Sequence, residues 1–158
     1  MKRLVNTVMC VCMIGSVGLS TATWASDEAA TKEAIKYRKN MMSAIGGHMG
    51  AAWQIIEGKV EHKGDLAMHT QALQVLSQDL VRLFPKGSDK GKTDALPVIW
   101  EKWADFEKVS KQASEYADKF ARAVADGDSA KISQAYREYG KQACKACHKD
   151  YRKDKKKK

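Results

Sequence analysis

Apolar residues recur at spacings of three and four along most of the chain, which is the period of an amphipathic α-helix. The period predicts four helices, carried by apolar stripes over residues 35–56, 66–83, 99–124 and 132–147. Pro97 suits the start of the third helix and Asp128 the N-terminal cap of the fourth. Valine, isoleucine and threonine are too sparse after residue 25 to favour strands. We therefore expect an all-α protein, an antiparallel up-down-up-down four-helix bundle with the first and fourth helices adjacent.

The first 25 residues have the pattern of a secretory signal peptide. Lys2 and Arg3 precede an apolar run over residues 4–19, and Ala25 ends a small-x-small cleavage site. A retained membrane anchor is the alternative, but the run is shorter than the roughly 20 residues of a stable span. We therefore expect residues 1–25 to be cleaved and the chain to be exported, to the periplasm where the host has two membranes. The processed chain is not expected to span a membrane.

Positive charge is concentrated at the C-terminal end of the chain. The net charge is +9, and residues 149–158 contain seven basic and two acidic residues. A nucleic-acid-binding domain would spread its basic residues along a helix or stripe, so no nucleic-acid partner is expected. Residues 153–158 are expected to form a disordered basic tail, which either serves solubility alone or attracts a redox partner that is acidic at the contact. The domain itself then spans residues 26–152.

One short motif near the C-terminus carries the chemistry, Cys144-Lys145-Ala146-Cys147-His148. Its spacing is that of c-type haem attachment. Two cysteines three apart on a helix can form thioethers with the two vinyl groups at one edge of a haem, and the adjoining histidine can bind the iron. The motif therefore predicts one haem c per chain, held covalently through Cys144 and Cys147, with His148 as an iron ligand.

Other uses of the two cysteines fit less well. A zinc site needs two more ligands at paired spacing, whereas His48, His62 and His69 are scattered along the chain. A redox dithiol belongs beside a βαβ unit, and a disulfide across three residues closes too small a loop to stabilise the fold. His69 lies on the second apolar stripe, where we expect a hydrogen-bonded histidine and not a metal ligand.

The position of the motif at the end of a predicted four-helix bundle resembles the class II c-type cytochromes, the cytochrome c-prime family. The resemblance covers roughly residues 28–152. Further matching segments are Tyr37-Arg38-Lys39-Asn40-Met41-Met42, Leu96-Pro97-Val98-Ile99-Trp100 followed by Phe106, and Tyr151-Arg152. The resemblance implies that Arg38 lies near a haem propionate and that Arg152 lies beside the imidazole of His148, one helical turn away.

The resemblance leaves the sixth ligand of the iron open. Some members of the family have a five-coordinate iron that binds small gases, and others have a first-helix methionine as the sixth ligand. The corresponding residue is Met42, whose sulfur is a suitable axial ligand, although a methionine on an apolar stripe can equally be a core residue. Met41 is the weaker candidate because it lies about 100° away around the helix.

These features predict a periplasmic monohaem cytochrome that carries single electrons for redox partner proteins. The alternative is a five-coordinate haem protein that binds or scavenges NO or CO, with Met42 over the open face. No set of side chains typical of an active site accompanies the motif, so an enzyme is not expected. The resemblance also implies a candidate homodimer through first-helix and second-helix surfaces.

Overall fold

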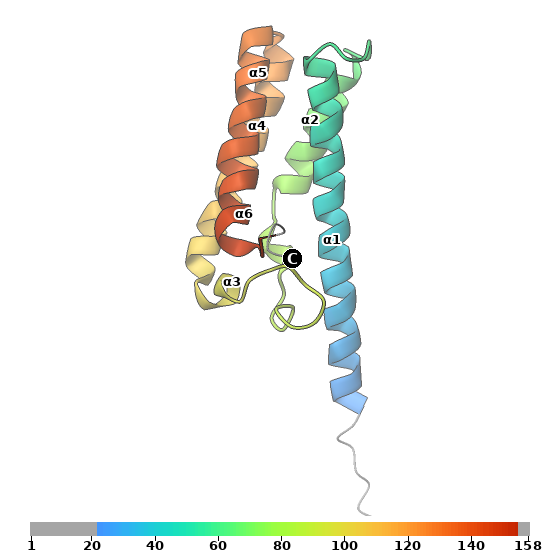
Figure 1. Cartoon of the computed structure of the whole chain (residues 1–158), viewed down its shortest axis with the longest axis vertical. Coiled ribbons are helices and arrows are strands. Elements are labelled where there is room, and N and C mark those ends of the chain that lie inside the picture. Colours follow the sequence, from blue (N-terminus) through green and yellow to red (C-terminus); the bar gives the residue numbers. More distant parts are fainter. Residues whose placement is uncertain (1–21, 155–158) are drawn as a thin grey trace, which may run out of the picture.

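The computed structural model describes residues 22–154, and these residues form an all-helical fold without a strand. Its N-terminal half contains α1 (Ala22–Ile56), α2 (Asp65–Ser77) and the 3-10 turn η1 (Val81–Leu83). Its C-terminal half contains α3 (Val98–Glu101), α4 (Trp103–Asp126), α5 (Ser129–Glu138), the π-helix η2 (Tyr139–Lys145) and α6 (Ala146–Tyr151). The predicted all-α four-helix bundle is confirmed (Figure 1), with α5, η2 and α6 together forming the fourth helix.

The helices pack in the order expected of an up-and-down bundle. α1 contacts α2, α2 contacts α4, and α4 contacts α5 and η2, while α5 returns to α1 as predicted for the first and fourth helices. The main core lies between these helices and includes Leu73, Phe120 and Tyr139, each almost fully buried. The sequence period thus predicted both the helices and their mutual arrangement.

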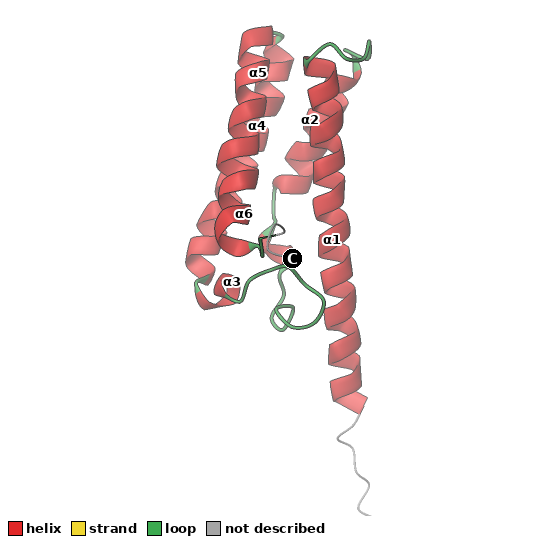
Figure 2. Cartoon of the chain, in the orientation of Figure 1, coloured by secondary structure: helices red, strands yellow, loops and turns green. Residues whose placement is uncertain are grey.

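A second buried cluster lies at the other end of the bundle. It is formed by Leu83, Phe84, Ala95, Ile99 and Phe106. Phe106 belongs to α4, but Phe84 and Ala95 belong to a long loop, residues 84–97, which contains no helix (Figure 2). The helical period of the sequence therefore did not predict the loop residues of this cluster. The same loop forms one wall of a cavity.

Three boundaries differ from the sequence prediction. The second helix ends at Ser77, and the last part of its apolar stripe is carried by η1, after which Pro85 prevents any further helix. The third helix is interrupted at Lys102, whose φ of −121° and ψ of 53° are not helical. The fourth helix changes to π-helix between Tyr139 and Lys145, a form that is frequent at functional sites.

The turn before the fourth helix confirms the prediction made for Asp128. Gly127 ends α4 in the left-handed region at φ 76°. The side chain of Asp128 then accepts hydrogen bonds from the backbone N–H groups of Ala130 and Lys131. Two adjacent residues therefore cap the two helices: Gly127 ends α4, and Asp128 pairs backbone N–H groups at the start of α5.

The two chain ends are only partly covered by the structure. Residues 1–21 of the predicted signal peptide and residues 155–158 of the predicted tail lie outside the described residues. Lys153, which we assigned to the tail, is bonded to the fold: its backbone N–H donates to Asp94 O at 2.8 Å and its Nζ to Thr93 O at 3.0 Å. No helix of the described region is long and apolar enough to cross a membrane.

Candidate functional site

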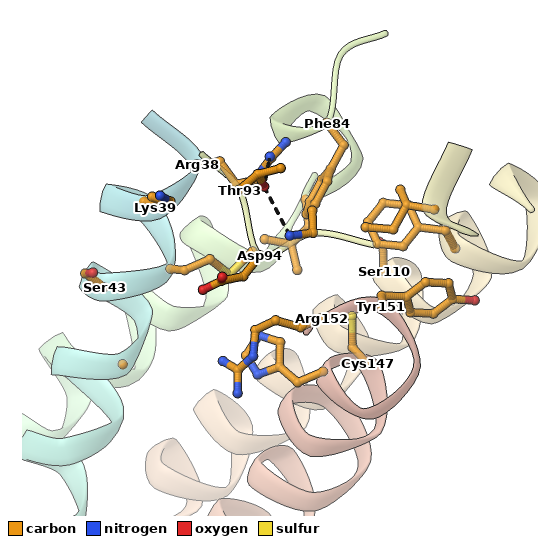
Figure 3. A pocket seen from close by; sticks show the side chains of 17 residues that line it. Arg38, Lys39, Ser43, Phe84, Thr93, Asp94, Ser110, Cys147, Tyr151 and Arg152 are labelled. Carbon is orange, nitrogen blue, oxygen red and sulfur yellow. Dashed lines mark hydrogen bonds between the residues drawn. The ribbon is translucent and has the colours of Figure 1, made fainter. Parts of the chain in front are cut away.

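A cavity of about 520 Å³ lies between α1, the long loop, α4 and α6. Figure 3 shows Arg38 and Thr93 on one side of it and Cys147 and Arg152 on the other. The wall is largely apolar, with few polar groups, as is usual for a cofactor pocket of this size. Its lining includes Arg38, Met42 and Gly46 from α1, Phe84 and Thr93 from the long loop, Ser110 from α4, and Cys147, His148 and Arg152 at the C-terminal end.

The attachment motif spans the junction between η2 and α6. Cys144 lies in the π-helix and packs against the main core, while Cys147 and His148 lie in α6 and line the cavity. Both thiols are free and partly buried. Burial raises the pKa of Cys147 to about 11 and also raises the pKa of Cys144. Before a haem is attached, both sulfurs are therefore thiols near neutral pH, as expected in apolar surroundings.

The first helix supplies another part of the cavity wall. Met42 lines the cavity and packs against both buried clusters. Met41 packs against the second cluster and does not line the cavity. Gly46, one turn after Met42, also lines it, and a Cβ atom built there would meet nothing within 4 Å. Gly46 therefore leaves open space one turn from Met42. The sequence pattern did not indicate this, because a glycine adds nothing to an apolar stripe.

Arg38 is buried, with only 4% of its surface exposed. Its guanidinium donates to Leu83 O (3.2 Å), to Ser88 Oγ (2.8 Å) and O (2.9 Å), and to Thr93 Oγ1 (2.8 Å). It also lies 4.7 Å from the ring centroid of Phe84. Burial lowers the pKa of Arg38. Arg38 therefore lines the cavity, and its polar atoms mainly hold the long loop.

Two buried polar atoms in the described part of the chain have no hydrogen-bond partner, and both belong to residues that line this cavity. They are Ser110 Oγ and Arg152 Nε. A buried unpaired polar group costs about 1–3 kcal/mol, so such atoms mark a place where a bound group supplies a partner. Together with Cys147 and His148 on the same wall, they show that the residues present fit a haem. Ser110 gave no signal in the sequence, since a lone serine on a helix has many uses.

The remaining histidines lie elsewhere. His48 Nδ1 and His69 Nδ1 are 3.0 Å apart between α1 and α2, so His69 is hydrogen-bonded as expected. His62 is exposed in the turn before α2. Within the described residues, no group of three or more histidine, cysteine, aspartate or glutamate side chains could hold a metal ion.

Comparison with known proteins agrees with this geometry. Residues 33–152 match the family model described as Cytochrome C′. The chain belongs to the cytochrome c′ family. Cytochrome c′ of Rhodospirillum rubrum is 30% identical over 155 residues, which cover 98% of this chain and 100% of the relative.

Solved structures of the family have the same fold. Cytochrome c prime from Shewanella frigidimarina superposes with a TM-score of 0.73 at 32% identity, covering 78% of this chain and 97% of the other. A nitric oxide complex of a cytochrome c prime mutant from Alcaligenes xylosoxidans gives a TM-score of 0.72 at 28% identity, covering 79% and 97%. As a cytochrome c′ family member, the chain carries haem c bound through Cys144 and Cys147, which the cavity accommodates.

Proposed function

We propose that this protein is an exported, periplasmic one-electron carrier in which His148 binds the haem iron and Met42 faces it as the sixth ligand. The observation that carries the proposal is that Met42 and His148 line one cavity from different helices, α1 and α6. When bound, the haem supplies a one-electron ferric–ferrous couple, and paired Met and His ligands raise its potential.

The protein's own residues hold the cofactor and control its surroundings. Cys144 and Cys147 anchor it to the fourth helix, and Phe84, Ile99 and Phe106 exclude water from its cavity. Arg152 lines the same cavity four residues after His148, but it directly follows the end of α6 in an extended conformation and is not on the helix face that the resemblance implied. A cation at that position tunes the electrostatic surroundings of the iron and its ligand.

A second function is supported by a specific feature of the cavity. Gly46 leaves open space one turn from Met42, and a relative's solved structure is titled as a nitric oxide complex. If Met42 only covers the iron, the same cavity admits NO or CO. The protein then binds or scavenges a small gas.

The absorption spectrum of the purified holoprotein distinguishes these functions. Low-spin ferric and ferrous spectra, the weak red ferric band of methionine–iron ligation and no change on adding CO support the electron carrier. A high-spin spectrum that shifts with CO contradicts methionine ligation and favours the gas-binding protein. Absence of covalently bound haem contradicts both.

Two kinds of protein partner accompany the proposal. The basic C-terminal residues favour a redox partner that is acidic at the contact, an attraction that weakens with salt. The second helix also exposes Met68 and Val75, at 54% and 63% of their surfaces, seven residues apart and on one face. This apolar face fits a homodimer through α1 and α2, which light scattering of the wild type and of Val75→Glu tests: the substitution should give monomers.

A further inference from the structure

The long loop (residues 84–97) joins the two sides of the cavity. At one end of the cavity it is bonded to α1, through three hydrogen bonds of Arg38 and through Lys39 Nζ, which donates to Lys92 O at 2.6 Å. Across the cavity it is bonded to the chain that leaves α6. Ala95 and Arg152 form an isolated antiparallel bridge, and Leu96 N–H donates to Tyr151 O at 3.0 Å. The loop is therefore a fixed link between two elements that do not follow each other in sequence.

Thr93 is the residue of this loop that is held from both sides. Its Oγ1 accepts hydrogen bonds from Arg38 Nη2 at 2.8 Å and from the backbone N–H of Ala95 at 3.1 Å. Its carbonyl oxygen accepts from Lys153 Nζ at 3.0 Å. The side chain is buried, with 7% of its surface exposed. One residue thus connects a cation of α1 with a cation that follows α6.

The connected segments lie close in sequence to Met42 and His148, which line the cavity from α1 and α6. Arg38 precedes Met42 by four residues on α1, and positions four apart share a helix face. Arg152, which forms the bridge to Ala95, directly follows the end of α6 in an extended conformation, four residues after His148. A change in the link is therefore transmitted to Met42 through one turn of α1 and to His148 through the end of α6.

We propose that Thr93 is a positioning residue that fixes the distance between α1 and α6, and with it the gap between Met42 and His148. The inference rests on the proposed function, because it concerns the space in which the iron is held. It holds for either coordination state. With Met42 bound, the link supports the methionine–iron bond; with an open site, it limits the room available to a gas molecule.

The test is Thr93→Val in the full-length holoprotein. Valine has nearly the shape of threonine but cannot accept the bond from Arg38. If Met42 is bound in the wild type, we expect the high-spin fraction of the ferric protein to increase. If the site is open, we expect the rate of CO association with the ferrous protein to rise several-fold. Thr93→Ser retains the acceptor and should restore the wild-type values. Lys153 is exposed, and Lys153→Met removes its hydrogen bond to the Thr93 carbonyl. This variant should change the CO association rate or the high-spin fraction in the same direction as Thr93→Val.

Thr70→Val is the matched control. Thr70 is also buried, with 1% exposed, and its hydroxyl bonds only to Ala67 O of its own helix at 3.0 Å. This variant should lose stability without a change in CO association. Wild-type CO kinetics and spin state in Thr93→Val, or the same change in Thr93→Ser, would overturn the inference. Failure of the proposed function is recognised separately, in the wild-type protein before any variant is compared: its spectrum would lack haem, or would be high-spin and shift with CO.

Discussion

Arg38 and Ser88 are 50 residues apart in sequence, and the guanidinium of one bonds both the hydroxyl and the carbonyl oxygen of the other, at 2.8 and 2.9 Å. The partners of this buried cation are neutral oxygens and the face of the Phe84 ring. The charge is therefore stabilised by dipoles spread over the long loop. A guanidinium can do this because its N–H donors form a planar fork.

Arg38→Lys should destabilise the protein although the charge is kept. An ammonium group cannot reach Leu83, Ser88 and Thr93 together, so buried oxygens lose their donors. We expect the free energy of unfolding to fall by about 2–4 kcal/mol, measured by urea denaturation. Arg122→Lys, on the exposed surface of α4, is the control and should change stability little; equal losses in the two variants would contradict the role given to the loop.

Ser77 and Tyr139 form a buried hydrogen bond of 2.7 Å between α2 and η2. Tyr139→Phe leaves the Ser77 hydroxyl without a partner, and Ser77→Ala does the same to the phenol. Each single change should cost about 1–3 kcal/mol. The double variant should cost less than the sum of the two, with a coupling of about 1 kcal/mol in a double-mutant cycle. Strict additivity would show that the hydroxyls do not interact.

Tyr139 also predicts a loss of stability at high pH. Burial raises its pKa from the ordinary value of 10.0 to about 12. Because the folded state keeps the proton over this range while the unfolded state releases it, the contribution is complete below pH 10 and is lost as the pH rises from 10 to about 12. Urea denaturation at several pH values should show this decline in the wild type. The decline should be weaker in Tyr139→Phe, and an identical slope would contradict the shift.

Met42 and Met41 offer a direct test of the sixth ligand. Met42→Ala should convert the protein to a high-spin form that binds CO, because only Met42 of the two lines the cavity. Met41→Ala removes a similar volume from the second cluster and should keep the wild-type spectrum. A high-spin spectrum in the wild type, unchanged by Met42→Ala, would show that the methionine is a cover and not a ligand.

Replacing two different glycines by alanine should change the stability of the protein in opposite directions. Gly127 has φ 76° at the end of α4, where a Cβ atom is strained, so Gly127→Ala should destabilise the protein by about 1 kcal/mol. Gly50 lies within α1 with nothing within 4 Å of a built Cβ, so Gly50→Ala should stabilise it by about 0.5–1 kcal/mol. Thermal unfolding measured by circular dichroism compares the two; a loss in both would mean that the space beside Gly50 is used by a partner.

The sequence by itself determined the helical period, the cap at Asp128 and the attachment motif, because each depends on residues within one or two turns of one another. It also indicated Met42 and Arg38 through a family resemblance. Only the tertiary structure decided what these residues contact. That Arg38 holds the long loop, that Ser110 faces the cavity and that Thr93 is bonded from both sides depend on segments 50 or more residues apart. The spacing of apolar residues within one helix cannot predict such contacts, because they depend on how the chain runs between the helices.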